Sequence, residues 1–328
     1  MHHLFAGLPV RQLGLAPYVP AVSDPLDFSA GEIGLDLAPG AYVHLPPNIA
    51  GYVGADHVAM LLATESWSSK SCNSKSRTKG SLFAVDIGTN TEITLAAGGR
   101  LLSCSCASGP AFEGAHLQDG MRAAPGAIER VSIEKGGIRY HTIADRPPVG
   151  ICGSGILDAV SGMIGAGIID DSGKFRMDSP LVRTKHEKQE LVLSPSSSTG
   201  HRRDIVVTRK DVNEIQLAKA AIRAGINILL KEAGLAADDI REFIIAGAFG
   251  TYLDLGSAVR IGMFPPLPLG RFRQVGNAAG IGAKQMLISA ARRSQAAEIA
   301  RRVNYIELTT HPDFTPEFLK AMYFPCRT

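Results

Sequence analysis

Several features that would assign a protein quickly to a class are missing from this sequence. It has no run of about 18 apolar residues, so we expect no membrane-spanning helix. Its opening stretch, MHHLFAGLPVRQLG, places no basic segment before an apolar one, so we expect no signal peptide. The charge is nearly balanced, with 34 Lys and Arg against 31 Asp and Glu, and this composition does not point to nucleic acid as a partner.

Cysteine is also scarce, with five residues at positions 72, 104, 106, 152 and 326. None of them forms a Cys-x-x-Cys pair, so the sequence predicts neither a zinc knuckle nor a ferredoxin cluster. Cys104 and Cys106 would place both thiols on one face of a strand, and we interpret them as small buried apolar residues. Unpaired thiols indicate a reducing compartment, so we expect a cytoplasmic protein.

Apolar residues and glycine, by contrast, are abundant. Hydrophobic residues make up 45% of the chain and charged ones 20%, which supplies a large core and argues against disorder. The 35 glycines indicate many tight turns and close backbone approaches. At 328 residues the chain exceeds one average domain, so two lobes are expected.

The most informative stretch is SLFAVDIGTNTEITLAA, residues 81–97, which predicts a strand, a tight polar turn and a second strand. Asp86 ends the first strand, and Gly88, Thr89 and Asn90 form the turn. Turn amides and a hydroxyl can bind phosphate oxygens, while the carboxylate can hold Mg²⁺ directly or through water. An ordinary Asx-type hairpin without a ligand fits this motif about equally well by itself, so the interpretation depends on the later glycine motifs.

A second glycine motif, Gly150-Ile-Cys-Gly-Ser-Gly155, precedes a helix predicted over 156–168. A glycine-rich helix start leaves backbone N–H groups free at the positive end of the helix dipole, which suits an anion. A helix entry where glycine merely permits close packing explains the motif equally well if it stands alone.

A third glycine motif follows a buried strand predicted over 242–246. Residues 208–234 carry an apolar stripe at helical spacing, so helix, strand and glycine turn come in the order of a nucleotide-binding lobe. Gly247 and Gly250 would let a base or ribose approach the backbone. Phe249 would pack on that ligand or, as the simpler interpretation, lie in the core.

Other segments predict supporting elements. Residues 1–50 hold many prolines and predict short strands and connections. Asp56 would lie in the first turn of a helix, where it suits the helix dipole, unless Gly51 and Gly54 bring that turn to a ligand. We also expect a helix over 55–63, a helix from 111 to about 117 and a hairpin over 127–143. An exposed excursion over 174–200 would contain a strand at 191–193, and a glycine turn at 276–283 would enter one helix that runs to about 300.

In this order and spacing, the glycine motifs resemble the actin/sugar kinase/heat-shock-protein ATPase (ASKHA) fold. They resemble more closely the reductive activators of corrinoid proteins, a ferredoxin-related family. The stretches that carry the resemblance are 86–92, 150–155, 245–250 and 276–280, and it extends to 47–56, 109–114, 121–127 and 251–256. It covers nearly the whole chain.

The resemblance implies an α/β fold, a ribonuclease-H-like ATPase lobe whose mixed sheet is flanked by helices, plus a partial first lobe. That lobe would span 80–328 with an excursion near 174–204. It would follow an exposed linker at 66–79 and a remnant of the first lobe at 1–65, because Met1–Phe5 resembles a mid-chain stretch of the family.

The resemblance also implies an ATP-dependent activator that passes electrons to an inactive cob(II)amide in a methyltransferase. ATP and Mg²⁺ would be the cofactors, and the partner would be a corrinoid protein or methyltransferase. The iron–sulfur cluster would lie in a ferredoxin domain outside this chain, supplied in cis or in trans, because this chain lacks the ferredoxin cysteine set. A homodimer is compatible with the family; nucleic acid and membrane partners are not expected.

Residue by residue, the family's second phosphate loop matches Asp86, Gly88, Thr89 and Asn90, with Asp86 toward the metal. The glycine turn near the nucleotide matches Gly153, Ser154 and Gly155. The border of the adenosine matches Gly247, Gly250 and Thr251. Glu92 or Glu113 would orient the attacking water, and the sequence does not choose between them.

Two other functions fit part of the sequence. A non-catalytic docking module for a corrinoid protein agrees with the incomplete first lobe. An activator of a radical dehydratase would need paired cysteines near a helix end at a dimer interface, and Cys152 is the one loosely comparable thiol.

Overall fold

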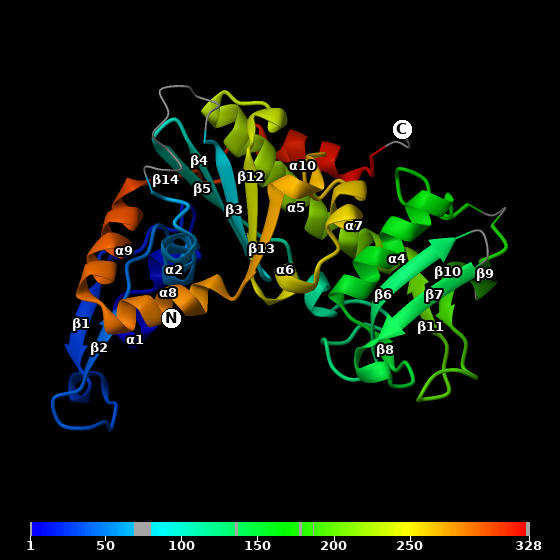
Figure 1. Ribbon diagram of the computed structural model, residues 1–328, viewed down its shortest axis with the longest axis horizontal. Coiled ribbons are helices and arrows are strands. Elements are labelled where there is room, and N and C mark those ends of the chain that lie inside the picture. Colours follow the sequence, from blue (N-terminus) through cyan, green and yellow to red (C-terminus); the bar gives the residue numbers. More distant parts are fainter. Residues whose placement is uncertain (1, 69–79, 135–136, 177–178, 186, 326–328) are drawn as a thin grey trace.

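A computed structural model describes residues 2–68, 80–134, 137–176, 179–185 and 187–325 (Figure 1). Its centre is a six-stranded mixed sheet in the order β13-β12-β3-β4-β5-β14. The strands β13, β12 and β3 run parallel, β3, β4 and β5 form antiparallel hairpins, and β14 returns parallel to β5. The strands are β3 (Leu82–Ile87), β4 (Thr91–Ala97), β5 (Arg100–Cys106), β12 (Glu242–Ala246), β13 (Phe272–Gly276) and β14 (Val303–Tyr305). The predicted α/β fold with a mixed sheet is confirmed.

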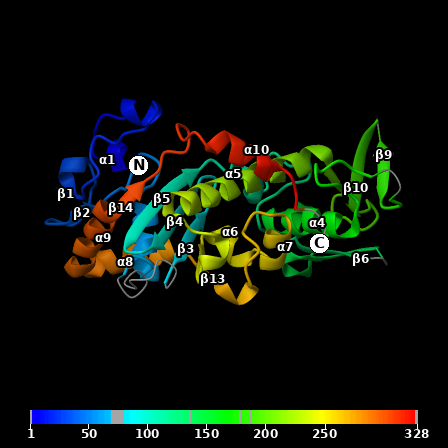
Figure 2. The ribbon, with the colours of Figure 1, turned by 90° about the horizontal axis from the view of Figure 1, so that it is seen from above.

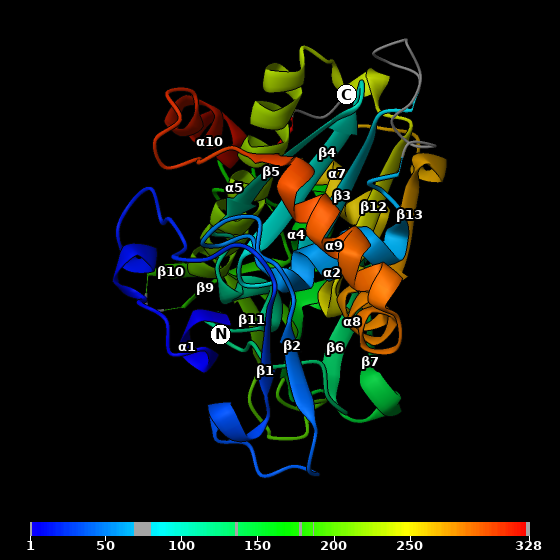
Figure 3. The same cartoon turned by 90° about the vertical axis from the view of Figure 1, so that its left-hand side faces the viewer.

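The two faces of this sheet bury different sets of side chains because successive residues of a strand point to opposite sides. Phe83, Val85 and Leu95 belong to the core on the side of α5 (Arg209–Ala233). Leu82, Ala84 and Ala96 belong to a second core, under three helices that Figure 3 shows in front of the sheet. Those helices are α2 (Ala55–Thr64), α8 (Ala278–Ile288) and α9 (Ala290–Arg302).

The long helix α5 has the ends that its sequence predicts. The Thr208 hydroxyl accepts from the Asp211 amide and the Asp211 carboxylate accepts from the Thr208 amide, which is a capping box. Gly234 ends the helix with a φ of 66°, a left-handed conformation that glycine adopts without strain. Figure 2 shows α10 (Phe314–Met322) lying along α5, the short helix predicted for the tail.

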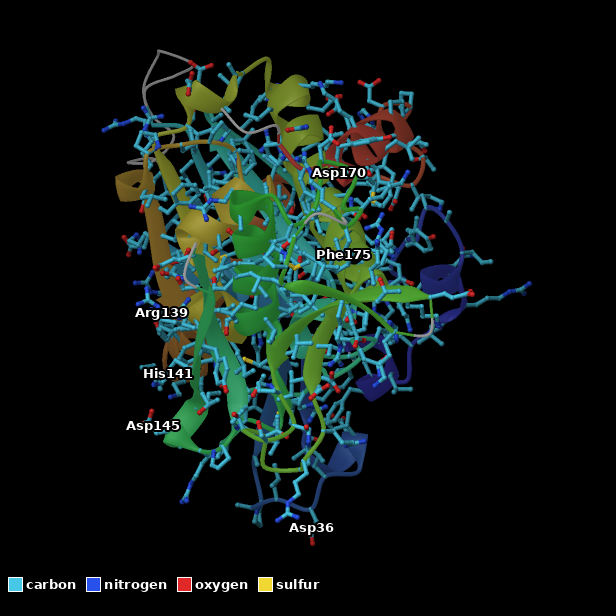
Figure 4. All side chains as sticks on the ribbon, turned by 90° about the vertical axis from the view of Figure 1, so that its right-hand side faces the viewer. Asp36, Arg139, His141, Asp145, Asp170 and Phe175 are labelled. Atoms are coloured by element: carbon cyan, nitrogen blue, oxygen red, sulfur yellow. The ribbon has the colours of Figure 1, made fainter. Side chains whose placement is uncertain are left out.

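At the other end of the molecule, α4 (Gly153–Ala166) packs on β6, and two small sheets surround this pair (Figure 1). One sheet joins β6 (Ala127–Glu134), β7 (Gly137–Thr142) and β8 (Gly150–Ile151); the other joins β9 (Val182–Lys185), β10 (Lys188–Ser194) and β11 (Ile205–Thr208). The predicted hairpin is confirmed as β6 and β7. Figure 4 views this end and labels Arg139, His141 and Asp145, all exposed on or just after β7.

Shorter elements complete the chain. The predicted short strands of residues 1–50 are confirmed as the hairpin of β1 (Leu26–Ser29) and β2 (Tyr42–Leu45), preceded by α1 (His2–Phe5). The short helices α6 (Ala248–Tyr252) and α7 (Leu255–Arg260) follow β12. Single 3₁₀ turns occupy Arg11–Gly14, Gly31–Ile33, Pro110–Glu113, Ile143–Asp145, Ala237–Asp239 and Leu269–Arg271. Among the residues that the structure describes, no helix combines the length and apolar character needed to cross a membrane.

Three predictions of local structure were wrong. The helix expected from 111 to about 117 is only a 3₁₀ turn, because Gly114 turns the chain with a φ of 80°. The helix expected from 276 to about 300 breaks at Ser289, whose extended backbone ends α8 and whose hydroxyl caps α9. The excursion over 174–200 is not simply exposed: the strand predicted at 191–193 is present within β10 and buries Leu191 and Leu193 in the core.

The predicted exposed linker over 66–79 falls mostly outside the described residues, which resume at Gly80. Its first residues are not exposed: Ser66 is buried and Trp67 packs partly buried against the α2 core. The division into a first-lobe remnant, a linker and a second lobe stays a prediction.

Candidate active site

The predicted phosphate loop lies on a cavity of about 800 Å³ at the end of β3. Asp86 is in register with Glu92 across the β3–β4 hairpin, so both carboxylates are on the α2 face of the sheet. Gly88, Thr89 and Asn90 of the turn line the same cavity. These residues are adjacent in sequence, so the hairpin alone brings them together. We call this space the acidic cavity.

A third carboxylate, that of Asp56, reaches the acidic cavity from α2. Burial raises the pKa of Asp86 to about 6 and that of Glu92 to about 8, and in both cases the charge of Asp56 adds to the shift. Sequence analysis had favoured the helix-dipole interpretation of Asp56, and its Oδ1 does accept from the His57 amide at 2.9 Å. The flanking Gly51 and Gly54, which also line the cavity, were the sequence signal for its second role.

The carboxylates of the acidic cavity lack a cationic partner. Its described lining includes no Lys or Arg, so nothing offsets the charge of Asp56, which raises the pKa of Asp86 and Glu92. Within the described residues, no three His, Cys, Asp or Glu side chains converge closely enough to hold a metal ion by themselves. One or two carboxylate oxygens, completed by water and phosphate oxygens, are the donor set that Mg²⁺ takes in nucleotide sites, and the residues present fit it.

Helix starts surround the acidic cavity. The first residues of α2, Ala55 and Asp56, and the first residues of α8, Ala278 and Ala279, line it. The side chain of Asn277 caps α8 by accepting from the Gly280 amide at 2.8 Å. The positive ends of two helices therefore face the space beside the carboxylates, which suits an anion that arrives with its own cation.

Gly247 separates the acidic cavity from a second one. Its φ of 93° is left-handed, and a Cβ there would lie 2.9 Å from the Asp86 carboxylate and 2.6 Å from the Ile87 carbonyl oxygen. A side chain at this position would therefore displace Asp86. The close approach at this turn is to the candidate metal ligand, and the predicted approach of a base or ribose stays a prediction.

The second cavity, of about 570 Å³, has aromatic walls. The rings of Phe112 and Phe249 stack with centroids 4.6 Å apart, and Tyr252 completes this wall. Glu113, Gly153 and Ser154 also line the cavity. We call it the aromatic cavity. Phe249 thus belongs to a cavity wall and packs on another ring.

The close-packing interpretation of the second glycine motif also holds. A Cβ at Gly153 would lie 1.9 Å from the Phe112 carbonyl oxygen, and one at Gly155 would lie 2.2 Å from that of Ile128. Gly155 lies on the packed side of α4 and lines neither cavity. Two residues of α6 also line neither cavity: Gly250 packs on Ile245, and the hydroxyl of the exposed Thr251 donates to the Gly247 carbonyl oxygen. For these residues a part in ligand binding stays a prediction.

The two candidate water-orienting glutamates lie in different cavities. Glu92 lies in the acidic cavity, where its carboxylate accepts from the Ser105 hydroxyl at 3.2 Å. Glu113 lies in the aromatic cavity and accepts from the Thr89 hydroxyl. The Thr89–Glu113 hydrogen bond therefore joins the turn of one cavity to the wall of the other.

The cysteines agree with a structural role. Cys104 and Cys106 are buried on the α5 face, and burial raises the pKa of Cys104 well above its ordinary value. Cys152 is buried at the start of α4 and donates to the Ile128 carbonyl oxygen at 3.4 Å. A radical dehydratase activator would need cysteines exposed at a dimer interface to bind its iron–sulfur cluster, and the buried Cys152 thiol does not meet this requirement.

Comparison with known proteins assigns family models to two parts of the chain. Residues 81–328 match the family model of the C-terminal domain of RACo, the ASKHA domain, and residues 1–67 match that of the RACo middle region. The chain is 34% identical over 333 residues to the corrinoid activation enzyme RamQ of Eubacterium limosum, a match that covers 99% of this chain and 54% of the relative. It is 29% identical over 318 residues to a Co(II) methylated amine-specific corrinoid protein reductase of Methanosarcina barkeri, covering 89% of this chain and 53% of the relative.

A solved structure of a reductive activator for a corrinoid, iron–sulfur protein superposes with a TM-score of 0.87 at 38% identity. The match covers 99% of this chain and 51% of the other, so the chain spans about half the length of the relatives it matches. The chain therefore belongs to the RACo family, the reductive activators of corrinoid proteins, and carries that family's ASKHA domain.

Proposed function

We propose that this chain binds Mg-ATP across the two cavities and that nucleotide turnover drives the reductive activation of a corrinoid protein. The observation that carries the proposal is the acidic cavity, where carboxylates without a Lys or Arg partner, two of them half-buried, face turn amides and two helix starts. The phosphates would lie there, and the adenosine would extend past Gly247 toward the aromatic cavity. Aromatic walls suit a flat base.

Each residue of the site would contact the part of Mg-ATP that suits its chemistry. Asp86 would hold Mg²⁺ directly or through water, while the amides of Gly88 and Asn90 hold phosphate oxygens. The Thr89 hydroxyl would join them by exchanging its hydrogen bond to Glu113 for one to a phosphate oxygen. When bound, Mg²⁺ bridges phosphate oxygens and neutralises the charge that develops on them. Gly153 and Ser154, with Gly247, Gly250 and Thr251, would border the adenosine.

We propose Glu92, in preference to Glu113, as the residue that orients the attacking water. Glu92 shares the acidic cavity with Asp86, whereas the Glu113 carboxylate is engaged by Thr89 in the wall of the other cavity. Its raised pKa suits a group that can hold a proton near neutral pH until a cation arrives. Catalysis would then consist of charge stabilisation and water positioning.

The electron path extends beyond this chain. We propose that the electrons come from an iron–sulfur cluster on a ferredoxin domain, supplied in cis or in trans, and pass to cob(II)amide in a corrinoid protein or methyltransferase. The described thiols, those of Cys104, Cys106 and Cys152, are all buried, which agrees with a cluster elsewhere. The cytoplasm is the compartment we propose, and a homodimer is a further proposal of the family resemblance.

Calorimetry with Mg-ATP tests the first step. We expect binding that depends on magnesium and that Asp86→Ala weakens strongly. If the chain captures a corrinoid protein but binds no Mg-ATP, it is a docking module and the proposed function is wrong.

A further inference from the structure

A buried hydrogen bond fastens the first turn of α2 to the central sheet. The side chain of His57 is 1% exposed, and its Nε2 lies 2.6 Å from the Thr94 hydroxyl oxygen on β4. The rest of the buried face of α2 is apolar, with Val58, Met60 and Leu61 fully enclosed. Apolar contacts are non-directional, whereas this hydrogen bond defines one position along the strand.

The direction of this hydrogen bond follows from its neighbours. The Thr94 hydroxyl donates to the Ser103 hydroxyl at 3.1 Å, and Ser103 donates to the Ile93 carbonyl oxygen at 3.0 Å. Each hydroxyl has one proton, so Thr94 can only accept from His57. His57 therefore carries a proton on Nε2. Burial lowers its pKa to about 3, so Nδ1 carries none and the imidazole is neutral. Its buried Nδ1 has no hydrogen-bond partner among the described residues.

The two ends of this hydrogen bond adjoin two carboxylates of the acidic cavity. Asp56 precedes His57 in the same turn, and Thr94 follows Glu92 by two residues on the same face of β4. The His57–Thr94 distance thus sets the separation between the turn that carries Asp56 and the strand that carries Glu92. The charge of Asp56 already reaches Asp86 and Glu92 across the cavity.

We propose that His57 is a positioning residue, which holds Asp56 against Asp86 and Glu92 through Thr94 and thereby shapes the acidic cavity for a divalent cation. The inference rests on the proposed function, because the cation is the one that accompanies ATP. His57 itself contacts neither the nucleotide nor the metal; it acts through the placement of α2.

Three variants and a control test this role by calorimetry with ATP, in Mg²⁺ and in EDTA. His57→Leu and Thr94→Val remove the hydrogen bond with little change in volume, and His57→Gln retains an amide donor near the Nε2 position. Thr64→Val is the matched control, since Thr64 hydrogen-bonds to the Met60 carbonyl oxygen at the far end of the same helix.

We expect His57→Leu and Thr94→Val to weaken Mg-ATP binding about tenfold and to leave ATP binding in EDTA unchanged. Their combination should weaken it no further than either alone, because both remove one interaction. His57→Gln should recover most of the affinity, and Thr64→Val should change neither measurement. A merely structural role would reduce binding with and without Mg²⁺ alike.

A second readout does not depend on ATP. In hydrogen exchange followed by mass spectrometry, both His57→Leu and Thr94→Val should speed exchange of the amides in the first turns of α2, and Thr64→Val should not. Nitrogen-15 NMR of the wild-type imidazole should show the proton on Nε2.

The outcomes separate this inference from the proposed function. If the wild-type chain binds Mg-ATP and the His57 and Thr94 variants keep its magnesium dependence, the inference is overturned and the proposed function stands. If the wild-type chain binds no Mg-ATP, the proposed function fails and the role of His57 toward the cation fails with it. Unchanged exchange in α2 overturns the positional claim in either case. If His57→Leu does not fold, the magnesium dependence of ATP binding in Thr94→Val and His57→Gln decides whether the inference holds.

Discussion

The two faces of the central sheet are built from the same strands but differ in chemistry. On the α5 face, the residues in register across β3, β4 and β5 are Phe83, Leu95 and Leu102, then Val85, Ile93 and Cys104. All six are apolar and buried.

On the α2 face, polarity increases toward the end of β3. The first row is Leu82, Ala96 and Leu101, the second Ala84, Thr94 and Ser103, and the third Asp86, Glu92 and Ser105. One face therefore carries the stability of the sheet, and the other carries the chemistry at its open end. Changes on the two faces should separate stability from ligand binding.

The largest expected effect is on the α5 face. Phe83→Ala removes a fully buried ring that packs against Phe243 at a centroid distance of 5.5 Å. We expect the free energy of unfolding to fall by about 3–5 kcal/mol, as measured by urea denaturation. Mg-ATP affinity of the folded protein should not change; if it does, the two faces are coupled.

The next effect is on ligand binding. Asp86→Ala should weaken Mg-ATP binding about 100-fold, or about 2.7 kcal/mol, because the cation loses its main carboxylate. The free energy of unfolding should stay constant or rise, since a buried carboxylate that repels Asp56 and Glu92 is removed. Asp145→Ala, at an exposed carboxylate far from the sheet, is the control and should change neither quantity.

A third effect concerns pH. The native pKa of Glu92, about 8, lies above its ordinary value of 4.5, so between these values the native state binds more protons than the unfolded state. Stability without ligand should therefore fall as pH rises from about 4.5 to about 8, by at most about 5 kcal/mol. Thermal denaturation should show the decline in the wild type and, between pH 6 and 8, its loss in Glu92→Gln, since the raised pKa of Asp86 contributes only up to about pH 6. If stability still falls between pH 6 and 8 in Glu92→Gln, a titratable group other than Glu92 causes the fall.

The smallest effect compares two helix caps. Thr208→Ala on α5 and Asn277→Ala on α8 each remove a capping side chain and should each cost about 1 kcal/mol of stability. Only Asn277→Ala should also weaken Mg-ATP binding, because α8 begins on the acidic cavity. If both variants weaken Mg-ATP binding equally, helices on the two faces of the sheet do not differ in their effect on the ligand.

Sequence reasoning worked where the signal was local. The hairpin around Asp86, the capping box of α5 and the strand before Gly247 were all predicted, because each depends on residues within a few positions of one another. The prediction of one helix over 276–300 failed at Ser289, where a residue common in helices turns extended and caps a new helix. The extended backbone at Ser289 is decided by how α8 and α9 pack against α2 and the sheet, which the sequence does not display.

For the site, the sequence by itself determined the turn between β3 and β4, the alternation that sends Asp86 and Glu92 to one face, and the glycine turn after β12. Only the tertiary structure decided that Asp56 joins those carboxylates, that Glu92 and Glu113 lie in different cavities, and that Phe249 stacks on Phe112. The physical reason is the range of each interaction. Alternation and turn geometry act between neighbours in the chain, whereas α2 reaches β4 through a hydrogen bond between residues 37 positions apart.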